Sequence, residues 1–178
     1  ENAAAYKRQI AYVPETPILY DELTLKEHLE LTMLAYGLDR DLTWQNAHQL
    51  LKIFRLDNKL DWFPANFSKG MKQKVMIVSA FMTDAKLFIV DEPFYGLDPL
   101  AVHDLLNLIE EKKAQGAGIL MSTHVLDTAQ RYCDRFILLA HGQVKAHGTL
   151  KELQQKAAGA GETLDDIYLR LARDESDE

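Results

Sequence analysis

Apolar residues recur at two different spacings along the chain, and the spacing changes near residue 84. Before it, residues such as Trp44, Ala47 and Leu51 recur every three to four positions, which is the period of an amphipathic helix. After it, the short apolar runs LFIV, GILMS and FILLA alternate with helical segments. Such alternation is typical of a parallel sheet that is covered on both faces. The pattern predicts a helical block followed by an α/β core.

The first residues predict a single strand and an extended loop. The segment RQIAYV reads as a short strand that ends at Pro14. Pro14 and Pro17 enclose Glu15 and Thr16, and the residue before each proline is restricted to extended backbone. We therefore expect a loop, and not a helix, to carry the chain from this strand into the helical block.

Capping signals set the limits of the predicted helices. Thr24 and Glu27 form a capping box, and the helix that they open ends near Gly37. A second amphipathic helix extends to Phe54, and a third runs from Ser68 to about residue 82. These helices make up the helical block.

Similar signals divide the core. Asp98 as N-cap and Pro99 at the first helical position predict a helix from 99 to 114 that stops at Gly116. The strand GILMS follows, then a helix through Gln130, and then the strand FILLA.

The turn at His141 and Gly142 predicts a hairpin in which QVKAH closes the sheet. Thr149 and Glu152 form a second capping box, which predicts a last core helix. The glycines at 159 and 161 predict a flexible segment after it. An apolar stripe predicts a short terminal helix, and the acidic final residues are expected to be disordered. The stripe consists of Leu164, Ile167, Tyr168 and Leu171.

Composition narrows the class of protein. With 178 residues, 47% of them hydrophobic, the chain can bury a substantial core. Its net charge of −7 and the lack of any long basic cluster argue against nucleic acid as a partner. The single cysteine, Cys133, excludes an internal disulfide and fits a reducing cytosol. No apolar run reaches the roughly 18 residues of a membrane span, so any membrane link must go through a partner.

The segment LFIVDEP places two carboxylates, Asp91 and Glu92, at the end of an apolar strand. Adjacent carboxylates repel each other, and a cation or a proton transfer offsets that repulsion. As a Walker B strand, this segment would hold Mg²⁺ through Asp91 and use Glu92 as the general base for water. The alternative is a solvated acidic turn.

Two further segments carry candidate chemistry. His124 closes the strand GILMSTH and is expected at the carboxyl edge of the sheet, where α/β proteins bind ligands; the alternative is a structural histidine. Ser68 and Gly70 stand at the start of a helix, where free N–H groups and the dipole favour an anion. The alternative for Ser68 is a simple N-cap.

Four segments taken together resemble a known family. FSKGMKQKV, LFIVDEP, GLDP and STH, in this order, resemble the signature motif, Walker B motif, D-loop and switch histidine of ATP-binding cassette (ABC) ATPases. The resemblance implies an α/β fold, with a P-loop NTPase (RecA-like) core, a parallel sheet and an inserted α-helical subdomain. The expected segments are 1–23 (core strand and Q-loop), 24–83 (helical subdomain), 84–158 (RecA-like core) and 159–178 (terminal helix and acidic tail).

The resemblance also implies roles for individual residues. Asp91 would bind Mg²⁺, Glu92 would be the catalytic base, and His124 would contact the γ-phosphate of ATP. Ser68 and Gly70 would bind the γ-phosphate of ATP held by a second, head-to-tail ATPase subunit. The D-loop residue Asp98 would communicate across that dimer.

The chain departs from the family pattern in the Q-loop, the signature motif and the segment before the D-loop. Glu15 stands where the family has a glutamine that touches Mg²⁺ and the attacking water, so a catalytic and metal-binding role is expected for Glu15 with altered tuning. In the signature motif, Phe67 replaces a leucine and Lys69 replaces a glycine. Before GLDP, Phe94 and Tyr95 replace a small polar pair.

The phosphate-binding loop GxxxxGK[ST] occurs nowhere in the chain. In the family this Walker A loop, its strand and the N-terminal β-subdomain precede the segment that begins here. We therefore expect a fragment that by itself is nearly inert towards ATP, because most phosphate donors and the lysine are missing.

The leading hypothesis is the ATPase subunit of a bacterial ABC transporter, of exporter type, bound peripherally at the cytoplasmic face of the plasma membrane to an integral membrane subunit. The loop at Tyr20 to Leu23 sits where relatives dock that subunit. One alternative is a soluble ABC ATPase of translation or DNA repair, for which a zinc module or basic arm is expected and is not visible here. Another is an interaction module without a phosphate-binding loop.

Overall fold

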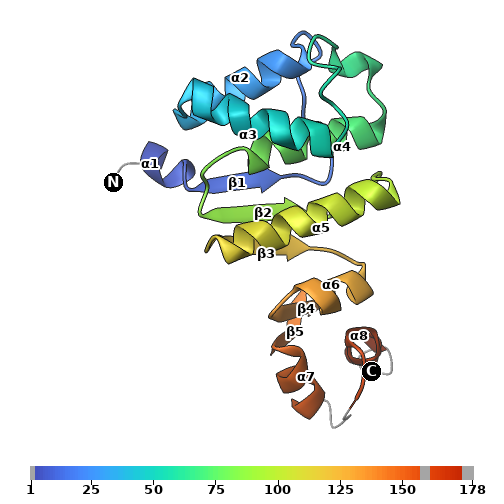
Figure 1. The fold of residues 1–178 in the computed structure, drawn as a ribbon. Coiled ribbons are helices and arrows are strands. Elements are labelled where there is room, and N and C mark those ends of the chain that lie inside the picture. The colour runs from blue at the N-terminus through green and yellow to red at the C-terminus, as the bar shows by residue number, and fades with distance from the viewer. Residues whose placement is uncertain (1–2, 157–160, 174–178) are drawn as a thin grey trace. The chain divides into compact units, whose positions relative to one another are not determined.

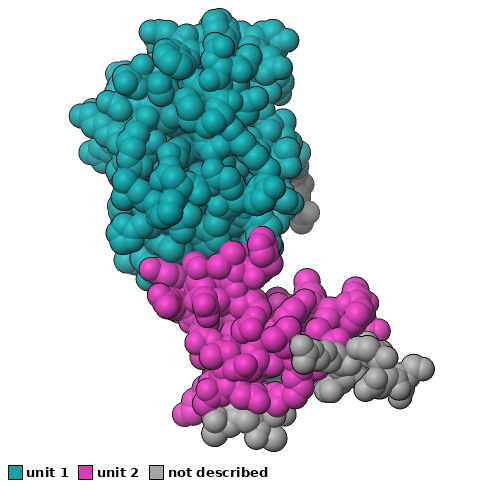
Figure 2. Space-filling model, turned by 90° about the vertical axis from the view of Figure 1, so that its right-hand side faces the viewer, with its two compact units in different colours: residues 1–122 teal, residues 123–178 magenta. Residues whose placement is uncertain are grey.

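The computed structural model describes residues 3–156 and 161–173. The chain divides into two compact units, residues 1–122 and 123–178, which Figure 2 shows in different colours. Each unit has its own hydrophobic cluster. The four segments expected from the sequence were defined by functional motifs, whereas these two units are defined by contacts. The four-segment division stays a prediction.

The first unit is built on a parallel three-stranded sheet in the order β1 (Ile10–Val13), β2 (Leu87–Asp91) and β3 (Gly118–Ser122). In its register Ile10 lies beside Leu87, and Leu87 lies beside Gly118. Because all the strands run the same way, they end at one edge of the sheet. We call this the carboxyl edge, formed by residues 12–15, 91–92 and 122.

The helices of the first unit are α1 (Ala3–Lys7), α2 (Leu25–Tyr36), α3 (Arg40–Ile53), the short 3-10 helix η1 (Pro64–Asn66), α4 (Lys69–Phe81) and α5 (Pro99–Ala114). Four of them, α2 to α5, begin at side-chain N-caps. The predicted capping box of Thr24 and Glu27 is present, and Gly37 ends α2 in a left-handed conformation with φ 66°. Helices α2, α3 and α4 lie together beyond β1 in Figure 1.

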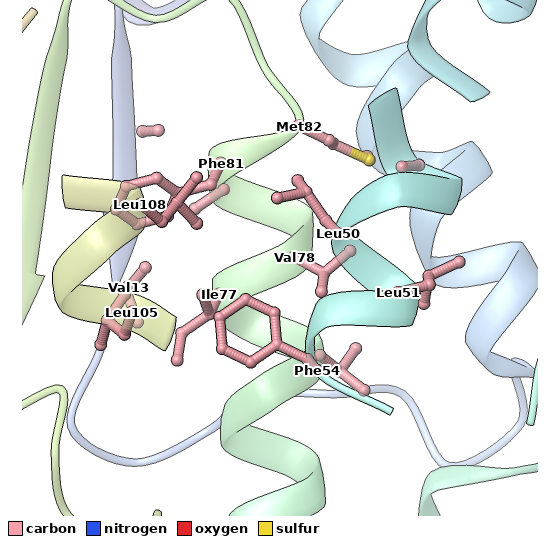
Figure 3. Packing of buried hydrophobic residues seen from close by; sticks show 14 of the residues in the cluster. Val13, Leu50, Leu51, Phe54, Ile77, Val78, Phe81, Met82, Leu105 and Leu108 are labelled. Atoms are coloured by element: carbon pink, nitrogen blue, oxygen red, sulfur yellow. The ribbon is translucent and has the colours of Figure 1, made fainter. Parts of the chain in front are cut away.

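The core of the first unit joins α4 to both the sheet and the helical block. In Figure 3, Ile77 and Phe81 of α4 lie among side chains of β1, α3 and α5. The ring of Phe81 stacks on that of Phe88 in β2, with 4.7 Å between centroids. Burying such aromatic side chains contributes about 1.5–3 kcal/mol each. This packing fixes the direction in which α4 leaves its N-terminal residue, Ser68.

The second unit contains α6 (Leu126–Tyr132), β4 (Phe136–Ala140), β5 (Gln143–Gly148), α7 (Leu150–Lys156) and α8 (Leu164–Arg173). Strands β4 and β5 form an antiparallel hairpin whose turn has positive φ at His141 and Gly142. The apolar stripe of α8 is buried through Leu164 and Ile167. The amide of Leu164 donates a 2.6 Å hydrogen bond to Gln130 Oε1.

Most element limits predicted from the sequence are confirmed, including both ends of α5 and the capping box of Thr149 and Glu152. The predicted pairing of FILLA with QVKAH is confirmed, since β4 and β5 are antiparallel neighbours. The hairpin and the parallel sheet belong to different units, so the prediction that the hairpin closes the sheet stays a prediction. Alternation of strands and helices reveals the type of sheet but not which strands share hydrogen bonds. The glycine at 159 and the acidic residues 174–178 lie outside the described residues.

Candidate functional site

The carboxylate of Asp91 lies at the carboxyl edge between two hydroxyl groups. Tyr12 Oη donates a hydrogen bond of 3.4 Å to Asp91 Oδ2, and Ser122 Oγ donates to Asp91 Oδ1. The strand register explains this arrangement, because Asp91 lies directly beside Ser122 and two positions beyond the neighbour of Tyr12. Donors on both oxygens hold the orientation of the carboxylate.

Glu15 belongs to the same edge of the sheet. It is an exposed residue of the loop after β1. Desolvation raises the pKa of Tyr12, and the negative charges of Asp91 and Glu15 raise it further. Tyr12 therefore stays a protonated donor at neutral pH. The structure thus brings Tyr12 close to Asp91 and Glu15, whereas the sequence predicted only the acids Asp91 and Glu15 as ligands of Mg²⁺.

The backbone of Glu92 is held in an unusual conformation directly after β2. Its φ is 42°, a left-handed value that costs a residue other than glycine about 1–3 kcal/mol. The Glu92 N–H donates to the Ser122 carbonyl at 3.0 Å, and its carbonyl accepts from the Tyr95 N–H at 3.2 Å. These bonds determine the conformation. Strain of this kind concentrates at functional sites.

The carboxyl edge suits a magnesium ion that is shared with phosphates. Within the described ranges, acids, histidines and cysteines do not gather in any group of three or more that could hold a metal. Magnesium commonly uses one or two carboxylates and keeps water and phosphate oxygens as its other ligands. Asp91 and Glu15 supply that number of carboxylates.

Ser68 is the N-cap of α4. Its Oγ accepts a hydrogen bond from the Met71 N–H at 3.2 Å, which confirms the simple alternative for this residue. The hydroxyl proton is still available to donate to an anion. The N-terminus of α4 thus combines a hydroxyl donor with the positive end of the helix dipole.

Steric contact explains why residue 70 is a glycine, an explanation that the sequence did not reveal. A Cβ atom built on Gly70 would lie 2.3 Å from the backbone oxygen of Gly96. Gly96 itself has φ 80°, in the region that favours glycine. The first turn of α4 and the turn before α5 therefore approach at a distance that excludes a side chain at position 70.

Asp98 joins the same two segments by charge. Its carboxylate caps α5 by accepting the Ala101 N–H at 2.9 Å, and it pairs with Lys74 Nζ at 2.7 Å. The hydrogen bond from Lys74 lowers the pKa of Asp98 to about 2. Lys74 is buried at 9% exposure, so removing its partner would leave a buried cation without a counter-charge.

Asp98→Asn is expected to destabilise the chain at neutral pH, because asparagine keeps the cap but leaves the buried Lys74 unpaired. The folded pKa of Asp98 lies below its ordinary value, so its stabilising effect is complete above about pH 4 and is lost as the pH falls towards 2. Urea denaturation of both proteins at several pH values measures this. A difference in midpoint that stays constant from pH 7 to pH 2 would contradict the ion-pair assignment.

His124 is an exposed residue of the second unit, two positions after Ser122 in the chain. The other candidate residues all belong to the first unit. The structure brings Glu15, Asp91 and Glu92 to the carboxyl edge, and it brings Ser68, Gly70 and Asp98 to the start of α4 and α5. The role of His124 stays a prediction.

Sequence reasoning missed Tyr12, Ser122 and Lys74 as partners of the candidate acids. Tyr12 and Ser122 could have been found from the strand register, since residues near the ends of neighbouring parallel strands share an edge. Lys74 lies one helical turn after Gly70, but only the tertiary packing brings it to Asp98.

Comparison with known proteins gives concordant results. The family model described as ABC transporter matches residues 1–95. The ABC-type transporter ATP-binding protein EcsA of Bacillus subtilis (strain 168) is 53% identical over 176 residues, which are 99% of this chain and 71% of that protein. The SkfA peptide export ATP-binding protein SkfE of the same organism is 30% identical over 172 residues, 97% of this chain and 70% of that protein.

A solved structure, described as the ATP binding subunit of an ABC transporter, superposes with a TM-score of 0.92 at 55% identity. It covers 96% of this chain, which spans 71% of that one. The match to EcsA bears out a resemblance to Ecs-type subunits that is carried by YVPETPILYDELTLKEHLELT, WFPANFSKGMKQKVMI and TLDDIYLRL. Among the described residues, no helix is both long and apolar enough to span a bilayer.

Proposed function

The chain belongs to the ABC transporter family, and from this premise we propose that it supplies the hydrolytic carboxylates and the signature helix of an exporter-type ATPase subunit. Members of the family are ATPases, bind ATP, generally with Mg²⁺, and work with membrane permeases. The observation that carries the proposal is the placement of Asp91 and the strained Glu92 at the carboxyl edge of a parallel sheet. The relatives named above are transporter subunits, which favours this role over translation or repair.

The first half of the proposed site is the carboxyl edge. Asp91, held by Tyr12 and Ser122, carries the charge that would hold Mg²⁺ through water. When bound, this ion would neutralise charge on the phosphate oxygens. Glu92 follows Asp91 in the chain and takes a proton from the attacking water. The fixed backbone at Glu92 determines where its side chain begins. His124 contacts the γ-phosphate in this proposal.

The second half is the N-terminus of α4. Ser68 donates its hydroxyl proton to the γ-phosphate of ATP held by a second, head-to-tail subunit, and Gly70 binds the same phosphate through the first turn of α4. Asp98, tied to α4 through Lys74, passes the state of one site to the other. Each subunit would then contribute one half to each of two shared sites.

We further propose that the subunit lies on the cytoplasmic face of the plasma membrane against an integral membrane partner. The loop from Tyr20 to Leu23 would face that partner. Its position is set by His28, whose Nδ1–H donates to the Thr24 carbonyl at 2.8 Å while its Nε2 accepts from the Tyr20 N–H at 2.8 Å. Export as the direction is supported by the names of two relatives, the SkfA peptide export ATP-binding protein SkfE and the Nod factor export ATP-binding protein I of Rhizobium sp. (strain N33). The second is 31% identical over 153 residues, which are 86% of this chain and 50% of that protein.

The test is phosphate release from MgATP by the intact subunit, by which we mean this chain joined to the phosphate-binding loop of the family. ATP-dependent phosphate release that is lost in Asp91→Asn supports the proposal. Release that is unaffected by Asp91→Asn would contradict it.

Glu15 is expected to tune the metal requirement. Glu15→Gln should raise the Mg²⁺ concentration for half-maximal ATPase activity modestly, because an amide oxygen is a weaker ligand than a carboxylate. Glu15→Ala should raise it further, because no ligand is left. Metal titration of the intact subunit measures both variants. Wild-type Mg²⁺ dependence in both would show that Glu15 is a solvated loop acid.

A further inference from the structure

Lys69 and Tyr95, two of the residues at which this chain departs from the family pattern, contact each other. The ammonium nitrogen of Lys69 lies 3.5 Å from the centroid of the Tyr95 ring, within the range of a cation–π interaction. Lys69 is the first residue of α4, and Tyr95 belongs to the turn between β2 and α5. The two departures from the family pattern, lysine for glycine at position 69 and tyrosine for a small polar residue at position 95, therefore form one contact.

The backbones beneath this pair are also in contact. A Cβ atom on Gly96 would lie 3.5 Å from Lys69 Cγ and 3.8 Å from the Gly70 nitrogen, so the lysine stem runs along Gly96. One helical turn further, Lys74 pairs with Asp98 at 2.7 Å. The first turns of α4 thus contact residues 95–98 at three successive points. Lys69 lies over the Tyr95 ring, the Gly70 backbone approaches Gly96, and Lys74 forms an ion pair with Asp98.

The outermost of these contacts lies beside Ser68. The other two hold α4 at Gly70 and at Lys74, on the C-terminal side of the N-cap. Tyr95 is 52% exposed, and the Lys69 ammonium lies over one face of its ring. Of the three contacts, the one made by Lys69 is nearest in the chain to the N-cap Ser68.

We propose that Lys69 and Tyr95 form a positioning pair that keeps Ser68 in place relative to residues 95–98. This inference rests on the proposed function, in which Ser68 donates to the γ-phosphate of ATP in the opposite subunit. The pair does not touch the reacting atoms. It sets where the Ser68 hydroxyl is presented, so its loss weakens the capture of ATP more than the chemical step.

The test is a double-mutant cycle in the intact subunit. Lys69→Met keeps the stem and removes the charge, and Tyr95→Leu removes the ring. We expect each to raise the KM for ATP about two- to fivefold, the range set by an exposed cation–π pair, with kcat nearly unchanged. The double variant should raise KM no further. Lys69→Arg and Tyr95→Phe, which keep the cation and the ring, should match the wild type.

The proposal would be overturned if the increases in KM of the two single variants multiplied in the double variant. A Tyr95→Phe protein with the KM of Tyr95→Leu would overturn it too. Failure of the proposed function is distinguishable, because the wild-type subunit would then release no phosphate from ATP at all.

A second readout needs no ATPase activity. A lysine held over an aromatic ring has side-chain protons shifted upfield by the ring current. In carbon–proton NMR spectra we expect the Lys69 Hε resonances to lie upfield of the ordinary position of a solvated lysine, to remain there in Tyr95→Phe, and to move to the ordinary position in Tyr95→Leu. Lys69 resonances at the ordinary position in the wild type would overturn the inference.

Discussion

Glu92→Gln in the intact subunit is expected to lower ATP turnover by about two to four orders of magnitude, the usual contribution of a general base, while ATP still binds. The amide keeps the shape of the side chain but cannot accept the proton of the attacking water. The left-handed backbone at residue 92 is held by two backbone hydrogen bonds, one donated to the Ser122 carbonyl and one accepted from the Tyr95 N–H, so the substitution leaves the backbone geometry intact. Phosphate release and ATP binding, measured on the same protein, separate the two effects.

Glu110→Gln provides the matched control, because Glu110 is an exposed residue of α5 whose pairing with Lys113 is a surface ion pair of little energetic value. It should turn over ATP like the wild type. Unchanged turnover in Glu92→Gln would remove Glu92 from the role of base and transfer that role to His124 or Glu15.

Gly70→Ala is expected to destabilise the first unit and to reduce ATPase activity in the intact subunit. In a helix, alanine is favoured over glycine by about 1 kcal/mol. Here the added methyl group would lie 2.3 Å from the Gly96 backbone oxygen, and relieving such overpacking costs about 1–3 kcal/mol. The clash outweighs the propensity, because a backbone carbonyl cannot rotate away as a flexible side chain does. Urea denaturation and phosphate release measure the two consequences.

Gly118→Ala is the control for this prediction. Its added Cβ would meet Leu87 Cδ1 at 3.5 Å, an ordinary van der Waals contact, so stability close to that of the wild type is expected. A Gly70→Ala protein that is as stable and active as the wild type would show that α4 and the turn before α5 do not approach as closely as described.

The helices could be predicted closely, because their limits are set by local chemistry. The cap at Asp98 and the proline at residue 99 begin α5, and the capping box of Thr24 and Glu27 begins α2. The order of strands could not be predicted in the same way. Strands β1 and β2 are neighbours although the whole helical block separates them in the chain, and no local pattern marks them as partners.

The candidate site divides along the same line. Asp91 ends β2 and Glu92 follows it, so both were evident from a short motif. Tyr12 and Ser122 became neighbours of Asp91 only through the pairing of segments far apart in the chain. Gly70 was expected to serve an anion, and the structure gives it a steric role against Gly96 as well. Interactions of this kind depend on tertiary packing, which no local pattern encodes.

The central proposal is that each subunit contributes two halves, with the carboxyl edge serving its own ATP and α4 serving the ATP of the opposite subunit. Ser68→Asp isolates the second half, because aspartate keeps the N-cap but repels a phosphate, and Ser68→Asn controls for the cap with a neutral side chain. Either Ser68→Asp or Glu92→Gln alone should be nearly inactive in the intact subunit.

The decisive measurement is the ATPase rate of an equal mixture of the Ser68→Asp and Glu92→Gln subunits. Half of the dimers would then contain one subunit of each kind, and one of their two shared sites would combine an intact Glu92 with an intact Ser68. We expect the mixture to recover about one quarter of the wild-type rate. A mixture that is no faster than the mean of the two variants measured separately would contradict a site shared between subunits.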